Sequence, residues 1–285
     1  MQIKELEDAV GLPLFDRRGK TTELTLSGEY LVVYARRVLA TLKEADDAMA
    51  RLRGAQGGRV TIGLVSTAKY FLPRLIAAFR VEHPGVEMRM WVGNREQLGR
   101  ALHDKDVDLA VMGRPPRELE TRAEPFAAHP HAIVASPDHP LARREGMAAA
   151  QLQDEGFIVR EPGSGTRAVM EAFFRAERIT PSFIMEMASN ETIKQAVIAN
   201  MGLAFLSLHT VGLEVKTREL VVLDVNGLPI VRRWHIVNLQ AKPLSPAAEA
   251  LRYFVLDRGE ALIAAQFSDT SPIAPALRKS RRKQA

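Results

Sequence analysis

The sequence contains no cysteine, and this absence excludes several classes of function. Disulfides, thiolate metal sites and cysteine redox sensors cannot form. Long hydrophobic runs are lacking as well, since no apolar stretch reaches the roughly 18 residues that a membrane-spanning helix needs. The opening segment, MQIKELEDAV, is charged and does not resemble a secretory signal peptide. These absences predict a cytoplasmic protein without a membrane partner.

The motifs of common enzymes and cofactor sites are also missing. The segment EPGSGTR has neither the length nor the Lys-Ser/Thr ending of a P-loop, and it does not match GxGxxG. No GxSxG elbow or other nucleophile–base pair is present. His129 and His131 share one side of an expected strand, with His139 nearby, but no acidic partner has metal-site spacing, so we interpret them as surface histidines. The sequence therefore predicts no enzyme activity, no cofactor and no metal site.

Composition and charge fit a globular protein but say little about its partners. The 285 residues are 46% hydrophobic and 26% charged, and this length suggests about two domains. The net charge of +5 hints at an anionic partner such as nucleic acid. That excess lies in the last eight residues, RKSRRKQA, whose cations are Arg278, Lys279, Arg281, Arg282 and Lys283. These residues end a Pro-rich segment, 268–285, which we expect to be disordered. The rest of the chain is neutral, so charge alone does not predict DNA binding.

A long amphipathic helix is predicted from Ser27 to Gly54, with Thr25 or Ser27 as its cap. Its apolar residues alternate at spacings of four and three, the heptad pattern of a helix that pairs with another. They are Leu31, Ala35, Val38, Leu42, Ala45, Met49 and Leu52. This seam could pack on the helix's own domain, but the hinge 56–58 follows at once and favours a dimerisation helix.

A compact segment precedes this helix. Residues 2–10 are typical of the end of a helix, and residues 12–26 are typical of a β-hairpin. Arg17, Arg18 and Lys20 lie at the expected tip of that hairpin. Cations on a hairpin tip are suited to contact a phosphate backbone or a minor groove, although three of them mean little alone.

From Gly58 onward, strands and helices alternate, which predicts an α/β fold with two similar lobes. Lobe strands are expected at 60–64, 86–92 and 107–112, and then at 157–160, 183–188 and 203–206. Two further strands, 129–136 and 233–239, should cross between the lobes, and a helix at 245–258 should close the first lobe. The expected boundaries are 1–26 for the hairpin unit, 27–58 for the long helix and hinge, 59–131 plus 235–262 for lobe I, and 132–234 for lobe II.

Four predicted helix starts follow strands of the two lobes, and such ends surround the ligand site in parallel sheets. They are Ser66-Thr67, Asn94, Gly163 to Thr166, and Ser189-Asn190. Cations lie within a few residues of them: Lys69, Arg95, Arg114, Arg160, Arg167 and Lys194. Each polar side chain alone is more readily explained as a helix cap. Four of them at equivalent strand ends predict a cleft between the lobes that binds an anion, either a carboxylate or a phosphate.

Several stretches of the chain resemble the LysR-type transcriptional regulators. IKELEDAVGLPLFDRRGKTTELTLSG is similar to the last part of that family's winged helix-turn-helix, and the long helix matches its linker helix. The bilobed part resembles the family's effector-binding domain, of the periplasmic-binding-protein type. Further motifs resemble the subfamily that regulates the RuBisCO operon (CbbR-type): STAKYFLP, VGNREQL, DLAVMGRPP, REPGSGTR, SNETIKQAV, LSLHTV and GLPIVRRW. The resemblance covers residues 2–258.

The resemblance implies a regulator of carbon-fixation genes that binds DNA and forms a homodimer or homotetramer. RNA polymerase is a further partner that the resemblance allows. Its implied effector is a phosphorylated metabolite such as ribulose bisphosphate, another sugar phosphate, phosphoenolpyruvate or NADPH. Together with the expected cleft, it gives these effector-binding residues: Ser66, Thr67, Lys69, Asn94, Arg95, Arg114, Ser164, Thr166, Arg167, Asn190 and Glu191. The implied DNA-binding residues are Gln2, Lys4, Arg17, Arg18 and Lys20.

The chain departs from the family pattern in two ways. It begins near the end of the recognition helix, so we expect an N-terminally truncated regulator. Ala199-Asn200 replaces the family's usual Ala-Gly, at a turn whose left-handed conformation asparagine tolerates. Two alternatives remain: a stand-alone small-molecule binding protein of the periplasmic type, and a LysR-type regulator of another metabolic operon.

We expect the 285-residue chain to bind DNA weakly and without sequence selectivity. Base readout needs the start of the recognition helix, whereas hairpin cations contact only phosphates. A gel-shift titration against the candidate promoter and scrambled DNA, at two salt concentrations, should show equal and salt-sensitive binding. Selective, salt-resistant binding by this chain would contradict the prediction. Selectivity that returns only in an upstream-extended chain would support it.

Overall fold

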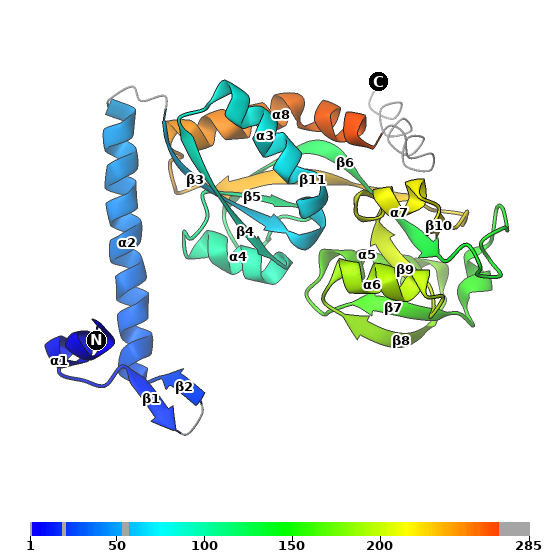
Figure 1. Cartoon of the computed structure of the whole chain (residues 1–285), viewed down its shortest axis with the longest axis horizontal. Coiled ribbons are helices and arrows are strands. Elements are labelled where there is room, and N and C mark those ends of the chain that lie inside the picture. The colour runs from blue at the N-terminus through cyan, green and yellow to red at the C-terminus, as the bar shows by residue number, and fades with distance from the viewer. Residues whose placement is uncertain (1, 19–20, 53–56, 268–285) are drawn as a thin grey trace. The chain divides into compact units, whose positions relative to one another are not determined.

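The computed structural model describes residues 2–18, 21–52 and 57–267, which belong to two units, 1–55 and 56–285. The first unit holds two helices and a hairpin, and the second holds the α/β fold (Figure 1). Lys20, part of the expected hinge and the expected tail 268–285 lie outside the described residues. No helix in the described ranges is long and apolar enough to cross a membrane.

The N-terminal unit contains its predicted elements, although the first strand of the hairpin begins three residues later than expected. Helix α1 (Gln2–Val10) is followed by strands β1 (Phe15–Arg18) and β2 (Thr21–Leu24), which pair antiparallel, and by α2 (Leu26–Leu52). The Glu7 carboxylate accepts hydrogen bonds from the backbone N–H groups of Leu14 (2.7 Å) and Phe15 (3.2 Å), which ties α1 to the hairpin. Thr25 Oγ1 accepts from the Gly28 N–H at 3.1 Å and so caps α2, as the sequence predicts.

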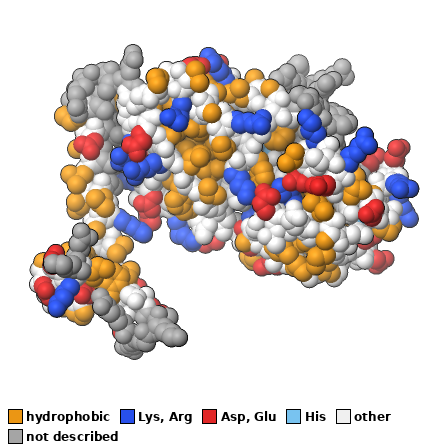
Figure 2. Space-filling view, in the orientation of Figure 1, with side chains coloured by type: hydrophobic (Ala, Val, Ile, Leu, Met, Phe, Trp, Pro, Cys, Tyr) orange, Lys and Arg blue, Asp and Glu red, His pale blue; other side chains and the backbone are white. Residues whose placement is uncertain are grey.

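Helix α2 leaves its predicted seam open to solvent within its own unit. Val38 and Leu42 are each 59% exposed, and Ala35, Ala45 and Met49 are exposed as well. Leu31 is half-buried, and the side chain of Leu52 lies outside the described residues. The exposed apolar surface is wider than the predicted seam, because it also includes Tyr30, Val33, Tyr34 and Leu39. Hydrophobic side chains along α2 are visible in Figure 2. Such a patch marks an interaction surface.

The C-terminal unit is built on a seven-stranded mixed sheet with the order β10-β6-β11-β5-β3-β4, in which β9 also pairs with β6. Strands β3 (Gly58–Val65), β4 (Val86–Gly93) and β5 (Leu109–Met112) are parallel, which confirms the predicted βαβαβ arrangement. Strands β6 (Thr121–Ala135), β9 (Ala204–Ser207), β10 (Val221–Val222) and β11 (Ile230–Leu239) are antiparallel to their neighbours. The sheet is therefore parallel only on the β5-β3-β4 side.

The two crossing strands are longer than predicted. β6 and β11 pair from Thr121–Leu239 to His131–Ile230, and β6 then continues to Ala135 beside β9 and β10. The expected strands began at 129 and 233. The first part of β6, TRAEP, is polar and half-exposed, so it lacks the apolar pattern by which a strand is predicted. One continuous strand therefore runs through both lobes (Figure 1).

Helices cover the two faces of the first lobe's sheet according to the alternation of side chains along the strands. Leu109 and Val111 of β5 pack in one core cluster with α3 (Leu72–Glu82) and α8 (Pro246–Gln266). Ala110 and Met112 pack in another with α4 (Arg95–His103). Helix α8 continues eight residues beyond its predicted end, because Gly259 does not break it. A Cβ at Gly259 would lie 2.7 Å from the Phe126 ring, so glycine permits this close contact.

The second lobe pairs β7 (Gly156–Arg160) in parallel with β8 (Ser182–Met187), and a bridge from Phe157 to Leu203 leads to β9. Helices α5 (Gly165–Glu177) and α6 (Asn190–Ile198) follow these strands. Asn200 adopts φ +56° after α6, so the left-handed turn survives the replacement of glycine. The remaining elements are short: η1 (Ser66–Tyr70), η2 (Ala149–Leu152), η3 (Leu208–Thr210) and α7 (Gly212–Lys216).

The substitution Leu42→Asp should abolish self-association through α2. Leu42 lies at the centre of the exposed seam, and a paired helix would bury the new carboxylate without a partner. Light scattering should show a monomer or a loss of soluble protein. Thr41→Asp is the matched control, because Thr41 is exposed one position away and outside the seam. A Leu42→Asp protein that remains a stable dimer through α2 would contradict the assignment.

Candidate functional site

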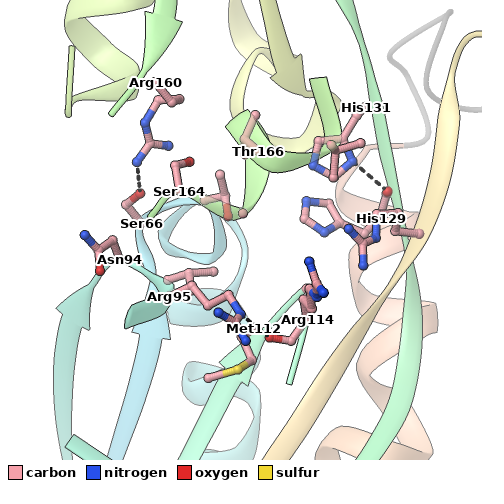
Figure 3. A pocket seen from close by; sticks show the side chains of 16 residues that line it. Ser66, Asn94, Arg95, Met112, Arg114, His129, His131, Arg160, Ser164 and Thr166 are labelled. Atoms are coloured by element: carbon pink, nitrogen blue, oxygen red, sulfur yellow. Dashed lines mark hydrogen bonds between the residues drawn. The ribbon is translucent and has the colours of Figure 1, made fainter. Parts of the chain in front are cut away.

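A pocket lies between the two lobes at the ends of their strands, with about 470 Å³ of open space (Figure 3). Both lobes and both crossing strands contribute to it. Its lining residues are Val65, Ser66, Thr67, Asn94, Arg95, Met112, Gly113, Arg114, His129, His131, Arg160, Ser164, Gly165, Thr166, Val169 and Arg232.

Two predicted helix starts face this pocket directly. Asn94 caps α4 through a reciprocal pair, because its side chain accepts from the Gln97 N–H at 2.9 Å and its own N–H donates to the Gln97 side chain at 2.9 Å. Ser164 is the N-cap residue of α5, but its buried hydroxyl makes no capping hydrogen bond. Thr166, in the first turn of α5, is buried as well. The start of α5 therefore presents two hydroxyl groups at the pocket.

The expected helix cap at Ser66-Thr67 is wrong. These residues begin the 3₁₀ helix η1, which has no side-chain cap, and the α-helix starts only at Leu72. Val65, the last residue of β3, occupies the N-cap position of η1, and its apolar side chain cannot accept a hydrogen bond. Both residues nevertheless line the pocket, and Ser66 Oγ accepts a hydrogen bond from Arg160 Nη2 at 3.2 Å.

The fourth helix start lies behind the pocket lining. Ser189 caps α6 by accepting from the Thr192 N–H at 3.4 Å, as predicted. Asn190 is buried and outside the lining, where its Oδ1 accepts from Arg160 Nη1 at 2.7 Å. Lys69 and Glu191 also lie outside the lining, and they form an ion pair at 3.6 Å.

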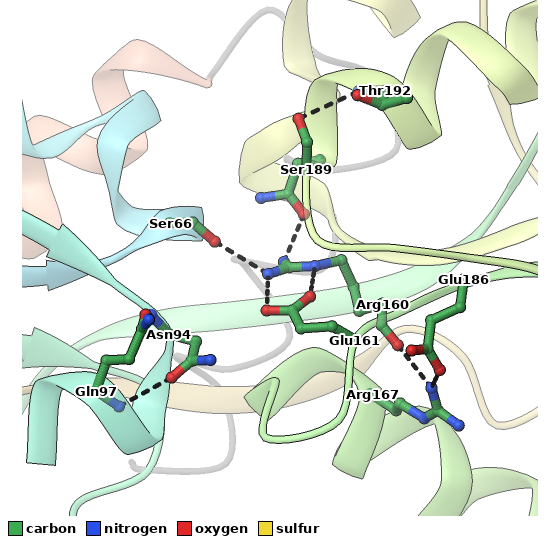
Figure 4. A network of polar contacts seen from close by, with 10 residues as sticks. Ser66, Asn94, Gln97, Arg160, Glu161, Arg167, Glu186, Ser189 and Thr192 are labelled. Atoms are coloured by element: carbon green, nitrogen blue, oxygen red, sulfur yellow. Dashed lines mark hydrogen bonds and ion pairs between the residues drawn. The ribbon is translucent and has the colours of Figure 1, made fainter. Parts of the chain in front are cut away.

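Arg167 does not face the pocket, contrary to the predicted placement. Its guanidinium donates to the carboxylates of Glu171 (2.8 Å) and Glu186, and to the backbone oxygen of Arg160 at 2.9 Å. Helix α5 turns this side chain toward Glu186 of β8 (Figure 4), and the Glu171 carboxylate of α5 also neutralises it. The expectation that Arg167 contacts the ligand rested on its position after the Gly-rich turn, and the local sequence does not show that Glu186 of β8 pairs with it.

Arg160 lies in the lining at the end of β7, but its guanidinium already donates hydrogen bonds to other side chains of the protein. It is buried, and one edge of its guanidinium, Nε and Nη2, donates to the Glu161 carboxylate at 2.7 and 2.9 Å. Its Nη1 donates to Asn190 Oδ1. Its Nη2 also donates to Ser66 Oγ (Figure 4). Arg160 therefore orders the pocket wall and connects the lobes rather than offering a free charge.

Arg114 and Arg232 carry positive charge in the lining. The charge of Arg114 acts on the carboxylate of the exposed Glu118, but the two groups form no ion pair. Among the described residues, no carboxylate lies within 4 Å of either guanidinium, whereas Arg95 has Glu118 at 3.7 Å. Burial and the neighbouring Arg114 lower the pKa of Arg232. Arg232, on β11, was missed in the sequence because it belongs to a crossing strand, far from any helix start.

The interpretation of His129 and His131 as surface histidines is wrong. They are 4% and 1% exposed, and they line the pocket as part of an aromatic group with Trp234. The Trp234 ring stacks on His129 with centroids 3.7 Å apart, and its Nε1–H donates to His209 Nδ1 at 3.1 Å. Burial lowers the pKa of His131 and His209 to about 3 and that of His129 well below its usual value. Each ring is therefore neutral near pH 7.

The sequence and the fold both match known transcription regulators. The family model of the LysR substrate binding domain matches residues 53–260. The HTH-type transcriptional regulator CfxR of Cupriavidus necator is 47% identical over 272 residues, which cover 95% of this chain and 86% of that protein. The RuBisCO operon transcriptional regulator of Allochromatium vinosum is 45% identical over 256 residues, which cover 90% of this chain and 85% of that protein.

One solved structure is similar in sequence as well as in fold. The regulatory domain of CcmR from Synechocystis PCC6803, in complex with 2-PG, is 37% identical. It superposes with a TM-score of 0.68 and covers 70% of this chain and 96% of that domain.

Stability should fall as the pH drops from 7 to 5. The buried histidines have pKa values below the unfolded value of about 6.5, so the unfolded chain binds the extra protons. Their contribution is complete above about pH 6.5 and is lost as the pH falls toward 3. Each neutral buried ring should lower the free energy of unfolding by about 1.4 kcal/mol for each unit by which the pH falls in this range. Urea unfolding at pH 7, 6 and 5 measures this slope.

The variant His209→Asn tests the cause of that slope, since its side-chain oxygen can still accept from Trp234. The slope between pH 6 and 5 should then decrease by about 1.4 kcal/mol per pH unit. A wild-type stability that does not change between pH 7 and 5 would contradict the assigned neutral state.

Proposed function

Because this chain belongs to the LysR family of transcriptional regulators, we propose that it senses a small phosphorylated metabolite in its interlobe pocket and thereby controls carbon-fixation genes. The observation that carries the proposal is the pair of unneutralised guanidiniums, Arg114 and Arg232, in the lining. Two positive charges that form no ion pair with a carboxylate of the described residues disfavour the empty pocket, and a bound anion relieves that cost. A doubly charged phosphate balances both.

The surrounding donors support a phosphate rather than a single carboxylate. Ser164 and Thr166 present hydroxyl groups at the start of α5, where the helix dipole favours negative charge. Arginine guanidiniums match phosphate oxygens in bidentate geometry. The complex of the similar CcmR domain with 2-PG, 2-phosphoglycolate, agrees with this ligand class. Our candidate effectors are 2-phosphoglycolate, phosphoenolpyruvate, ribulose bisphosphate or another sugar phosphate, and NADPH.

The target genes are proposed from the relatives. Regulators named for the RuBisCO operon, or as CfxR, align with this chain over 90–95% of its length. That alignment includes most of the N-terminal unit as well as the pocket-bearing unit, which favours a regulator over a stand-alone binding protein. On this proposal α2 forms the homo-oligomer, and DNA contacts come from α1 and the hairpin, with Lys4, which is exposed, among them.

Replacing either free guanidinium should weaken effector binding. We expect Arg114→Gln and Arg232→Gln each to reduce the affinity for 2-phosphoglycolate about tenfold to a hundredfold, the usual cost of about 1.5–3 kcal/mol for a charge-assisted contact. Isothermal titration calorimetry with each candidate effector gives these affinities. Arg100→Gln is the control, since Arg100 is exposed on α4 and pairs with Glu96 outside the lining. The site assignment fails if no candidate effector binds the wild type, or if both pocket variants bind unchanged.

A further inference from the structure

The pocket wall formed by β6 carries two imidazoles in addition to the guanidiniums to which we assign the phosphate. His129 and His131 are adjacent on one face of the strand, with ring centroids 4.1 Å apart, and both line the pocket (Figure 3). Arg232 is the cross-strand partner of His129 in the β6–β11 register, so the two side chains share a face of the sheet. The imidazoles therefore lie beside the guanidinium to which we assign the phosphate.

The hydrogen bonds of His131 fix which nitrogen carries its proton. His131 Nδ1 lies 3.1 Å from the backbone oxygen of His129, and a carbonyl oxygen can only accept, so Nδ1 is the donor. In the neutral ring Nε2 is then an acceptor. An acceptor nitrogen in a pocket for phosphate repels the phosphate oxygens unless it gains a proton.

His129 has an unsatisfied nitrogen at the same wall. Its Nε2 shares a hydrogen bond of 3.0 Å with Ser207 Oγ, while its buried Nδ1 has no hydrogen-bond partner in the part of the chain that the structure describes. That Nδ1 points toward Gly113 of the lining, since a Cβ built on Gly113 would lie 2.8 Å from it. Only glycine leaves this approach open, and a buried polar atom without a partner is a costly feature that a ligand can relieve.

Burial and the charged groups around the two rings disfavour a positive charge on them in the empty pocket, and only the His129 backbone oxygen that accepts from His131 acts in the opposite direction. The charged and titratable neighbours are Arg114 after β5, Arg232 and His235 on β11, and His209 on η3. Ser207, Phe205 and Trp234 contribute neutral contacts. Within the described ranges, no carboxylate forms an ion pair with either ring. Burial, aided by Arg232, accordingly lowers the pKa of His131 to about 3.

A phosphate dianion reverses each of these effects. It neutralises the guanidiniums whose charge opposes an imidazolium, and it supplies acceptor oxygens for the new N–H. We propose, on the basis of the function proposed above, that His129 and His131 form an effector-binding pair that takes up one proton when a phosphate dianion enters the pocket. The pair takes up one proton rather than two, because a second would meet the charge of the first across 4.1 Å.

Proton uptake makes binding depend on pH in a defined direction. The pKa of the pair rises from its low value in the empty pocket toward or above the ordinary histidine value in the complex, so affinity increases as the pH falls below the pKa of the complex. The expected gain is about tenfold for each pH unit in that range. A carboxylate monoanion brings half the charge, so its binding should be less strongly linked to a proton.

Calorimetry on the full chain measures the proton directly. Binding enthalpies for 2-phosphoglycolate and for sulfate are measured at pH 6 in buffers of different ionisation enthalpy, whose slope gives the protons taken up. A proton can be exchanged by the histidine pair or by the ligand itself, because a phosphate monoester has a second pKa of about 6. Sulfate remains a dianion at this pH, so its uptake reports the protein alone. We expect about one proton per bound sulfate in the wild type and close to none in His131→Asn or His129→Asn. His209→Asn is the matched control, a buried histidine outside the lining, and should keep the uptake.

Nitrogen-15 NMR of the histidine-labelled wild type tests the same proton uptake without any variant, so the test does not depend on whether the variants fold. The ring nitrogens of one histidine should change from a neutral to a protonated pattern on saturation with sulfate at pH 6. The inference is overturned if ligand binds without proton uptake, or if uptake persists in both pocket variants. If neither 2-phosphoglycolate nor sulfate binds at all, both the proposed function and this inference fail. Binding without proton uptake overturns the inference alone, so the two failures are distinguishable.

Discussion

The pairing of β6 with β11 is the constraint on which the pocket depends. This antiparallel pair ends at His131–Ile230, where β6 passes from the first lobe's sheet to β9 and β10 of the second. A strand shared by two lobes places its side chains at their boundary. His129 and Arg232 therefore reach the pocket from hydrogen-bonded strands, whereas Ser66 and Ser164 reach it from the turns that open helices. Groups on paired strands are held more rigidly than groups on loops.

The distribution of carboxylates, rather than the number of cations, determines what the pocket can bind. Lys194 is buried near the lobe boundary, but Glu214 at 2.6 Å and Glu191 at 2.9 Å compensate its charge. Arg160 is compensated in the same way by Glu161. A buried charge with its partner in place has little to gain from a ligand. The two guanidiniums without such partners are the ones whose charge an entering anion can neutralise.

Local patterns in the sequence predict the fold well and the site only in part. Apolar periodicity and capping residues such as Thr25 and Asn94 specify helices and parallel strands, because those signals act within a few residues. They cannot show that Arg167 meets Glu186 or that Arg232 lies opposite His129, because these contacts join distant segments. The histidines were misjudged for the same reason: the rings that bury them come from β9, β11 and η3.

Two polar contacts between the lobes connect occupancy of the pocket to the arrangement of the lobes. Tyr70 donates to the Glu191 carboxylate at 2.5 Å, and burial together with Glu191 raises the pKa of Tyr70, so this donor keeps its proton at neutral pH. Ser66 accepts from Arg160 inside the lining. A ligand that binds Ser66 competes with the second contact, whereas Tyr70 and Glu191 lie outside the lining. A ligand shifts a conformational equilibrium only through contacts that differ between states. The Ser66–Arg160 contact is therefore where ligand binding and lobe contact compete directly, while β6 and β11 keep the lobes joined.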